Sequence, residues 1–216
     1  MSSNSRAAIL ARIRAANQAS EDTNRMDKQL LEWAALPRLY RTQGALNEAD
    51  RIKLFEERIR HYNGTPFYST GDIKIDIASI LTERQKGTLI VPTAFPEEWL
   101  PSGFQFVREE NLSKHELNSA EGVVTACTLG IALTGTVVLE SSPTQGRRAA
   151  TLIPDYHLCI LRKHDIVELV PEAIRRLEPM KHRPLTFFSG PSATVDIEMT
   201  RVRGVHGPRT LDVLLI

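Results

Sequence analysis

Leu185-Thr-Phe-Phe-Ser-Gly-Pro-Ser192 joins a short apolar run, typical of a buried strand, to a loop of serine, glycine and proline. A second loop, Gly204-Val-His-Gly-Pro208, precedes the apolar run Leu211-Asp-Val-Leu-Leu-Ile216, which indicates another buried strand. Open α/β folds place their ligand sites on loops at strand ends. We therefore expect both loops to carry a polar site beside the core of a sheet.

The side chains on these two loops suit ligand binding. The serines supply hydroxyl groups, and the glycines let the backbone approach a ligand closely. His206 is the best candidate for a catalytic group, because an imidazole can donate or accept a proton; the alternative is a hydrogen-bond anchor for its loop. Ser192 or Thr194 could instead cap a helix whose first turn holds Asp196 and Glu198. The expected ligand-binding residues here are Ser189, Gly190, Ser192, Gly204, His206 and Gly207.

Strand-like and helix-like segments alternate from residue 72 onward. Alternation of this kind predicts an α/β fold, with an open, mainly parallel sheet and helices on both faces. Asn47 and Ser113 are expected to cap further helices at 47–61 and just after residue 113. Leu129–Leu133 and Val137–Leu139 should form a tight hairpin. The expected strands are 88–91, 105–107, 123–126, 157–161, 185–188 and 211–216, and the expected helices are 72–84, 146–152 and 166–177.

Two further segments could bind an anion. Thr134-Gly-Thr136 can form a turn whose hydroxyl and amide groups face an anion, or a plain hairpin turn. Gln145-Gly-Arg147 leads into a helix, where free N–H groups and a forked guanidinium would favour a carboxylate or phosphate; the alternative is a solvated arginine. The expected ligand-binding residues here are Thr134, Gly135, Thr136, Gln145, Gly146 and Arg147.

The first residues differ from the rest of the chain. Ile9, Leu10 and Ile13 have helical spacing with arginines opposite, and the polar stretch 17–27 indicates a linker. We predict an N-terminal helical extension over residues 1–26 and a single α/β domain over 27–216. The apolar residues that follow the linker are expected to be core or interface residues. They are Trp33, Leu36, Leu39 and Tyr40.

The bulk composition excludes several classes of function. Lys and Arg total 27 against 26 for Asp and Glu, so a strongly basic nucleic-acid surface is not indicated. Cys127 and Cys159 lack metal-ligand spacing, and we expect both to be buried and reduced, although they could pair by count alone. The histidines also lack ligand spacing, so no metal and no cofactor are expected. Without a membrane span or a secretory signal, the cytoplasm is the expected location.

Several sequence blocks resemble the lactate-utilisation protein C family, whose domain is called LUD. The blocks are residues 189–209, Val124–Leu139, Gln145-Gly-Arg147 with Leu152-Ile-Pro154, and the N-terminal stretch Ser5–Arg14. The resemblance covers the whole chain at low density and residues 120–216 at high density. It implies the open α/β fold of glucosamine-phosphate isomerases, ribose-phosphate isomerases and coenzyme A transferases.

The resemblance also implies a role in L-lactate utilisation, in which lactate is oxidised to pyruvate together with iron–sulfur partner proteins. This chain has no cysteine cluster, so it would be an accessory component that binds a small anion or a partner. One alternative is an enzyme acting on a small carboxylate, phosphate or thioester, which predicts that Arg147 and His206 share a pocket. Another is an interaction module that uses its N-terminal helix.

Two positions depart from the family pattern. The family usually has a glutamate directly before the Thr/Ser-Gly-Thr turn and an aspartate five residues earlier. This chain has Leu133 and Thr128 at those positions. The nearest downstream acid, Glu140, lies beyond the expected hairpin, and its direction is open. If the family's acids transfer protons, this chain lacks both.

Overall fold

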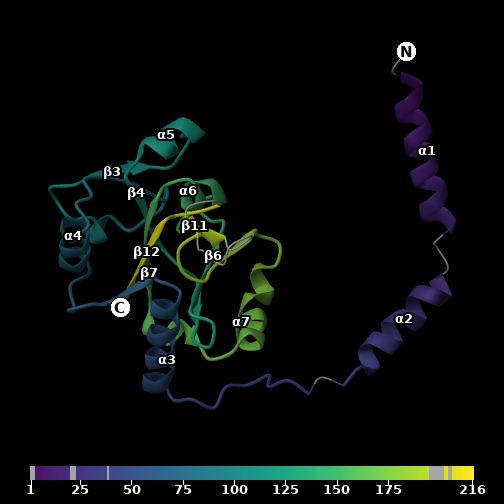
Figure 1. The fold of residues 1–216 in the computed structure, drawn as a ribbon, viewed down its shortest axis with the longest axis horizontal. Helices are drawn as coiled ribbons and strands as arrows, with labels where there is room; N and C mark the ends of the chain where they lie inside the picture. The colour runs from purple at the N-terminus through teal and green to yellow at the C-terminus, as the bar shows by residue number, and fades with distance from the viewer. Residues whose placement is uncertain (1–2, 20–22, 38, 195–201, 204–205) are drawn as a thin grey trace. The chain divides into compact units, whose positions relative to one another are not determined.

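A computed structural model describes residues 3–19, 23–37, 39–194, 202–203 and 206–216. The chain forms two compact units, Met1–Tyr40 and Arg41–Ile216. The first unit contains helices α1 (Ser3–Ala19) and α2 (Thr23–Ala35) (Figure 1). The predicted N-terminal helix is confirmed, but the predicted linker is wrong where α1 and α2 extend into it. Residues 17–27 contain no glycine or proline, and polarity alone does not interrupt a helix.

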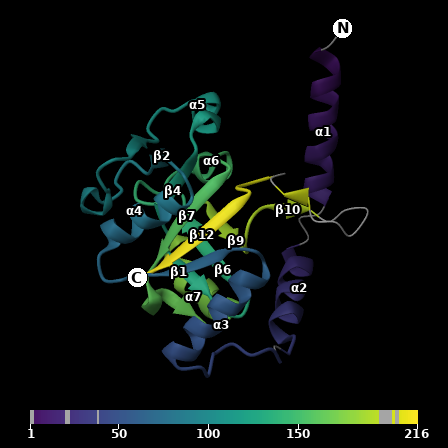
Figure 2. The same ribbon diagram turned by 60° about the vertical axis from the view of Figure 1, so that its left-hand side comes forward.

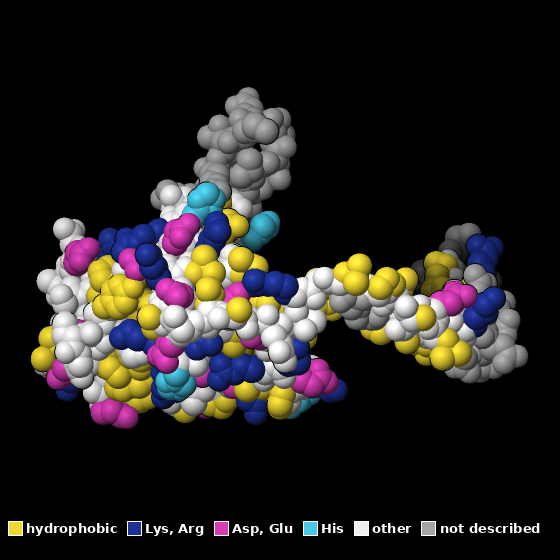
Figure 3. All heavy atoms as spheres, turned by 90° about the horizontal axis from the view of Figure 1, so that it is seen from below, with side chains coloured by type: hydrophobic (Ala, Val, Ile, Leu, Met, Phe, Trp, Pro, Cys, Tyr) yellow, Lys and Arg dark blue, Asp and Glu magenta, His cyan; other side chains and the backbone are white. Residues whose placement is uncertain are grey.

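The apolar residues after the predicted linker are not buried within their unit. Trp33, Leu36, Leu39 and Tyr40 are all exposed, Leu39 by 92%. Figure 3 shows apolar side chains at the surface of these helices. A core role for the four residues is therefore wrong, whereas an interface role stays a prediction, as does the domain boundary between residues 26 and 27.

The second unit is built on a sheet of six parallel strands in the order β1-β12-β7-β4-β2-β3 (Figure 2). The open parallel sheet predicted from the sequence is confirmed. The sequence does not predict the edge strand β1, because this strand is short and contains Pro66, whose missing N–H suits only an edge. The strands are β1 (Thr65–Tyr68), β2 (Thr88–Val91), β3 (Gln105–Arg108), β4 (Gly122–Ala126), β7 (Tyr156–Leu161) and β12 (Thr210–Leu215).

A second sheet has four strands in the order β8-β5-β6-β9. The predicted hairpin is confirmed as β5 (Leu129–Ile131) and β6 (Thr136–Glu140), and β9 (Leu185–Phe188) pairs antiparallel with β6. The predicted helix at 166–177 is wrong at its start. Residues Ile166–Val167 form strand β8, and α7 (Val170–Leu177) begins with Pro171 in its first turn, where proline is favoured.

Helices cover both faces of the six-stranded sheet, as predicted. Helix α4 (Ile73–Glu83) packs on one face. The opposite face packs against α3 (Glu48–His61), α5 (Lys114–Ser119), α6 (Arg148–Leu152) and the second sheet. Helix α7 covers the outer face of the second sheet. The remaining elements are the 3₁₀ helices η1 (Glu97–Trp99), η2 (Lys163–Asp165) and η3 (Glu178–Met180), and strands β10 (Ala193–Thr194) and β11 (Val202–Arg203), which pair with each other.

Strand β7 shows why a continuous apolar run predicts a buried strand. Leu158 and Ile160 face α4, whereas Cys159 and Leu161 face α3 and the second sheet, so every residue of the strand is buried. A strand buried on both faces is continuously apolar, which distinguishes it from a half-exposed one. The expectation that Cys127 and Cys159 are buried and reduced is confirmed.

A partly buried ion pair joins the six-stranded sheet to the end of helix α4. Asp212 of β12 is fully buried and accepts hydrogen bonds from Arg84 Nε at 2.7 Å and Nη2 at 3.0 Å. The Tyr156 hydroxyl donates to the same carboxylate at 3.0 Å. Hydrogen bonding to Asp212 raises the pKa of Arg84, and burial raises the pKa of Tyr156. These shifts keep Arg84 charged and Tyr156 neutral at neutral pH.

The first residues of the second unit are tied to its body. The Glu168 carboxylate accepts hydrogen bonds from the backbone N–H groups of Ala45 at 2.6 Å and Leu46 at 2.7 Å, and it also pairs with Arg41. Glu172 of α7 accepts from Gly44 N–H at 3.0 Å. These bonds lower the pKa of Glu168, because they favour its ionised form.

Candidate functional site

The residues predicted to bind a ligand fall into three groups. The first lies where the β5–β6 turn meets the end of β9. The Thr136 hydroxyl lies 2.6 Å from that of Ser189 and 2.7 Å from that of Thr134. These hydroxyls satisfy one another, so the group forms a link between two strands.

The glycines of this first group contact helix α3. Gly135 has φ +56°, and a Cβ there would lie 2.6 Å from the backbone of Arg58 and Ile59. Gly190 has φ +83°, and its Cβ would lie 2.5 Å from the carbonyl oxygen of Tyr62. Both glycines thus allow close packing of backbone against backbone, a use that the sequence does not distinguish from close approach of a ligand.

The second group lies at the carboxyl edge of β2, β3 and β4. The side-chain amide of Gln145 exchanges hydrogen bonds with the Thr128 hydroxyl at 2.9 and 3.0 Å. Its oxygen also accepts from Glu140 N–H at 2.9 Å. Thr128, which occupies the family's aspartate position, is thus engaged by Gln145, and Glu140 itself pairs with Arg183 at 3.0 Å.

An internal carboxylate takes the place expected for an anion at Arg147. The backbone N–H of Arg147 donates to Glu109 Oε1 at 3.0 Å, and its guanidinium donates to the carbonyl oxygens of Glu109 and Leu112. Burial raises the pKa of Glu109, although the Arg147 N–H opposes the shift. Glu109 and Arg147 line a cavity of about 450 Å³. Glu109 is not among the residues predicted from the sequence, although its position just after an expected strand is a signal for such a role.

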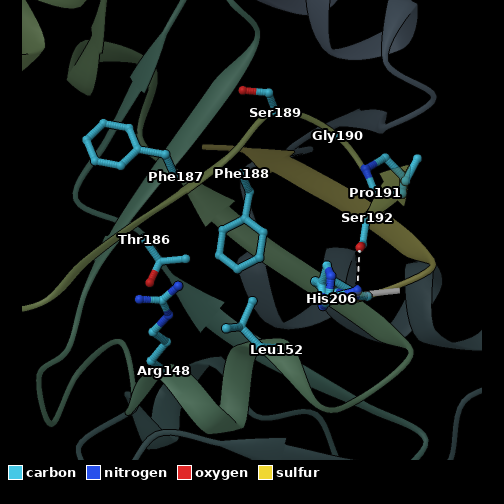
Figure 4. A pocket seen from close by; sticks show the side chains of 13 residues that line it. Arg148, Leu152, Thr186, Phe187, Phe188, Ser189, Gly190, Pro191, Ser192 and His206 are labelled. Carbon is cyan, nitrogen blue, oxygen red and sulfur yellow. Dashed lines mark hydrogen bonds between the residues drawn. The ribbon is translucent and has the colours of Figure 1, made fainter. Parts of the chain in front are cut away.

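The third group surrounds a cavity of about 350 Å³ between β9 and α6 (Figure 4), here called the β9–α6 cavity. It brings together five of the predicted residues: Ser189, Gly190, Ser192, His206 and Gly207. The other lining residues are Arg148, Leu152, Thr186, Phe187, Phe188, Pro191, Ala193 and Pro208.

The interior of the β9–α6 cavity combines an apolar floor with hydrogen-bond donors. The side chains of Phe188 and Leu152 face each other across it, and Arg148 extends from α6 toward Thr186. Within the described part of the chain, Arg148 bonds through its backbone to Ser141 and Thr151, and its guanidinium has no hydrogen-bond or ion-pair partner. The Ser192 hydroxyl oxygen accepts the His206 backbone N–H at 3.0 Å, which leaves its own hydrogen free for a ligand.

A larger cavity of about 830 Å³ adjoins the first. The two share Arg148, Leu152, His206 and Gly207, and the second adds Arg209 and Asp155. The His206 loop enters β12 at its first residues, so this site lies at the amino edge of the six-stranded sheet rather than the carboxyl edge.

One prediction is wrong at this site. Arg147 and His206 line different cavities, because Arg147 turns toward Glu109 whereas Arg148 reaches the β9–α6 cavity. The helix that Ser192 or Thr194 could cap falls on residues outside the described part of the chain, and Ala193–Thr194 themselves form a strand. The sequence predicts Arg147 rather than Arg148 as the ligand-binding arginine. The signal for Arg148 is its spacing of four residues from Leu152, which places the two side chains on one face of a short helix. Gly204, Asp196 and Glu198 lie outside the described residues.

The described residues show neither a metal site nor a membrane span. Among the described residues, no three His, Cys, Asp or Glu side chains lie close enough to hold a metal ion. The helices in the described ranges are all too short or too polar to cross a bilayer.

Comparisons with known proteins identify clear relatives. The LUD domain family model matches residues 98–216. A protein named Lactate utilization protein C from Deinococcus radiodurans is 40% identical over 181 residues, which are 82% of this chain and 84% of the relative. A protein of the same name from Bacillus subtilis is 34% identical over 50% of this chain and 46% of its own length.

A solved structure extends the likeness to three dimensions. The crystal structure of a DUF162 family protein from Deinococcus radiodurans matches with a TM-score of 0.68 and 35% sequence identity. The match covers 79% of this chain and 99% of that one.

Proposed function

This chain belongs to the LUD domain family, and we propose that it is an accessory component of L-lactate utilisation that acts by binding. The resemblance seen in the sequence is confirmed by the family match. In our proposal the chain works in the cytoplasm with iron–sulfur partner proteins that oxidise lactate to pyruvate. The observation that carries the role is its 40% identity to a protein named for lactate utilisation, over most of both chains.

The chemistry of the β9–α6 cavity supports binding of an anionic group. Its polar lining includes three groups that can donate a hydrogen bond: the Arg148 guanidinium, the Ser192 hydroxyl and an N–H of the His206 imidazole. A guanidinium recognises a carboxylate through two parallel N–H···O bonds, which gives direction as well as charge. The cavity can therefore hold a carboxylate, either of a small acid or of a protein side chain.

Oxidation of lactate to pyruvate removes two electrons and two protons, and in our proposal the partner proteins accept the electrons. Cys127 and Cys159 are both buried, and their sequence spacing does not suit a cluster. This chain would then contribute recognition, with Arg148 orienting the carboxylate.

A genetic experiment tests the role. A strain lacking this gene should grow normally on glucose and poorly on L-lactate, and the wild-type gene should restore growth. A gene carrying Arg148→Gln should restore it only partly, whereas Arg60→Gln, on helix α3 and lining neither of these two cavities, serves as the matched control. Normal growth of the deletion strain on L-lactate, with no second copy of the gene present, would contradict the proposal.

A further inference from the structure

Strand β9 has an open edge. It is the last strand of its sheet, and in the described residues it pairs only with β6. An unpaired edge presents a row of backbone N–H and C=O groups to any extended chain beside it. The four residues of β9 carry no charge and no proline, so nothing in the strand blocks such pairing.

The register shows which groups of β9 face outward. The carbonyl of Val138 in β6 accepts Thr128 N–H at 2.8 Å, so Val138 directs its backbone groups toward β5. Because the direction alternates along a strand, Val137 and Leu139 direct theirs toward β9, where their partners are Phe188 and Thr186. Phe187 therefore has both its N–H and its C=O on the outer edge.

The β9–α6 cavity runs along this same strand. Thr186, Phe187 and Phe188 line it on one side, and Arg148 and Leu152 of α6 line it on the other. A hollow between an edge strand and a helix is the architecture that peptide-binding domains use for strand addition. There, main-chain bonds supply affinity, and pockets for alternate side chains supply specificity.

The charge of the β9–α6 cavity determines which kind of peptide it can bind. Arg148 has no ionic partner in the described structure and points into the cavity. Arg209 lines the adjoining cavity, where it lies 3.6 Å from Asp155. An acidic side chain would satisfy the Arg148 guanidinium, while an apolar one would contact Phe188 and Leu152. Together the two cavities are also larger than a three-carbon acid requires, and they suit a more extended ligand.

We propose that the β9–α6 cavity binds an extended, acidic segment of a partner protein, which adds a strand to the outer edge of β9. This inference rests on the proposed function, because it names the kind of partner that an accessory component would recognise. An aspartate or glutamate of that segment pairs with Arg148, and a neighbouring apolar residue enters between Phe188 and Leu152.

A library of random heptapeptides displayed on phage is the probe, with the full chain as bait. Selected peptides should combine an acidic residue with apolar ones. Phe187→Pro should reduce their affinity at least tenfold, because proline has no N–H to pair at the outer edge. Phe187→Ala keeps that N–H and should retain most of the affinity. Arg148→Glu should also reduce it at least tenfold.

Hydrogen exchange on the wild-type chain tests the pairing without any substitution. Binding of a selected peptide should slow exchange at the Phe187 amide, while the Phe188 amide, already paired with β6, should change little. Failure to select acidic peptides, equal binding to Phe187→Pro in its folded state, or an unprotected Phe187 amide would overturn the inference. Binding of L-lactate, and of no peptide, in this cavity would also overturn it.

The two proposals fail separately. A deletion strain that grows normally on L-lactate removes the metabolic role, but it leaves peptide binding measurable on the purified chain. Absence of peptide binding, with growth on L-lactate lost in the deletion strain, removes the strand-addition inference alone.

Discussion

At the scale of single residues, the carboxylate of Asp212 depends on one partner for its charge balance. Arg84 supplies two hydrogen bonds to this fully buried group, and removing it leaves an uncompensated charge in the sheet. We expect Arg84→Ala to lower the free energy of unfolding by about 3 kcal/mol. Chemical denaturation at pH 7 measures the change.

The matched control is Arg209→Ala. Arg209 also faces an aspartate, Asp155, but both side chains are largely exposed. Exposed pairs contribute little, so the expected loss is below about 1 kcal/mol. Equal losses for the two variants would show that the burial of Asp212 does not determine how much its ion pair contributes to the free energy of unfolding.

His157 predicts a dependence of stability on pH. Its ring is fully buried, Nε2 lies 2.8 Å from the Thr125 hydroxyl, and Nδ1 has no partner among the described residues. Burial lowers its pKa from 6.5 to about 3. Below pH 6.5 the unfolded chain takes up a proton that the folded chain refuses, so stability falls as the pH drops toward 3.

The size of this effect can be measured by substitution. The His157 contribution should lower the free energy of unfolding by at most about 1.4 kcal/mol for each pH unit between 6.5 and 4.5. His157→Gln, whose amide can still bond Thr125, should lack this slope although its stability at pH 7.5 is lower. Denaturation curves at several pH values compare the two; parallel slopes would refute the assignment.

At the scale of elements, the contact between the end of β9 and helix α3 depends on Gly190. Its positive φ and its closeness to Tyr62 O leave no room for a Cβ. Gly190→Ala should therefore cost more than the roughly 1 kcal/mol that positive φ alone imposes on alanine. Gly103→Ala is the matched control, because Gly103 has φ +90° but open space around it. A thermal melt of each variant tests the order of stability.

Elements were predictable where the pattern was local. Asn47 caps α3 through a hydrogen bond to Asp50 N–H at 2.9 Å, and Ser113 begins α5 with a capping box. Such signals lie within three or four residues. The pairing of β6 with β9 was not predictable, because it joins segments far apart in sequence. The sequence predicts a helix at β8, because two apolar residues directly before α7 fit a helical period as well as a strand period.

The candidate site was predictable in its residue types more than in its geometry. Ser192, His206 and Gly207 meet in one cavity, as two neighbouring loops suggested. Gly135 and Gly190 instead serve packing against α3, and a sequence shows only that glycine is present. Glu109 and Arg148 reach their places through tertiary structure: a strand end in one case, and the rotation of a five-residue helix in the other.

At the scale of the whole molecule, the α/β unit should be stable without the first helices. In the described structure, every buried apolar side chain lies at position 55 or later in the chain. Deletion of residues 1–40 should therefore shift the melting temperature of the remaining unit by less than about 4 °C, the change expected for 1 kcal/mol in a chain of this size. Calorimetry of both chains measures the shift.

A large decrease would show that the first unit contributes to the core. The corresponding control deletes residues 1–46, which also removes the backbone N–H groups bound by Glu168 and Glu172. That second deletion should lower the melting temperature further, because two carboxylates lose their partners.

The position of β12 has a consequence for synthesis. Strand β1 has β12 as its neighbour in the sheet, and β12 also completes β7. On the ribosome, β1 therefore emerges long before residues 210–215 have been translated. Until they arrive, the nascent chain holds two unpaired strand edges and the apolar surfaces beside them. Chains with unpaired strand edges and exposed apolar surfaces associate with one another. This protein should therefore rely on chaperones until β12 has been translated and pairs with β1 and β7.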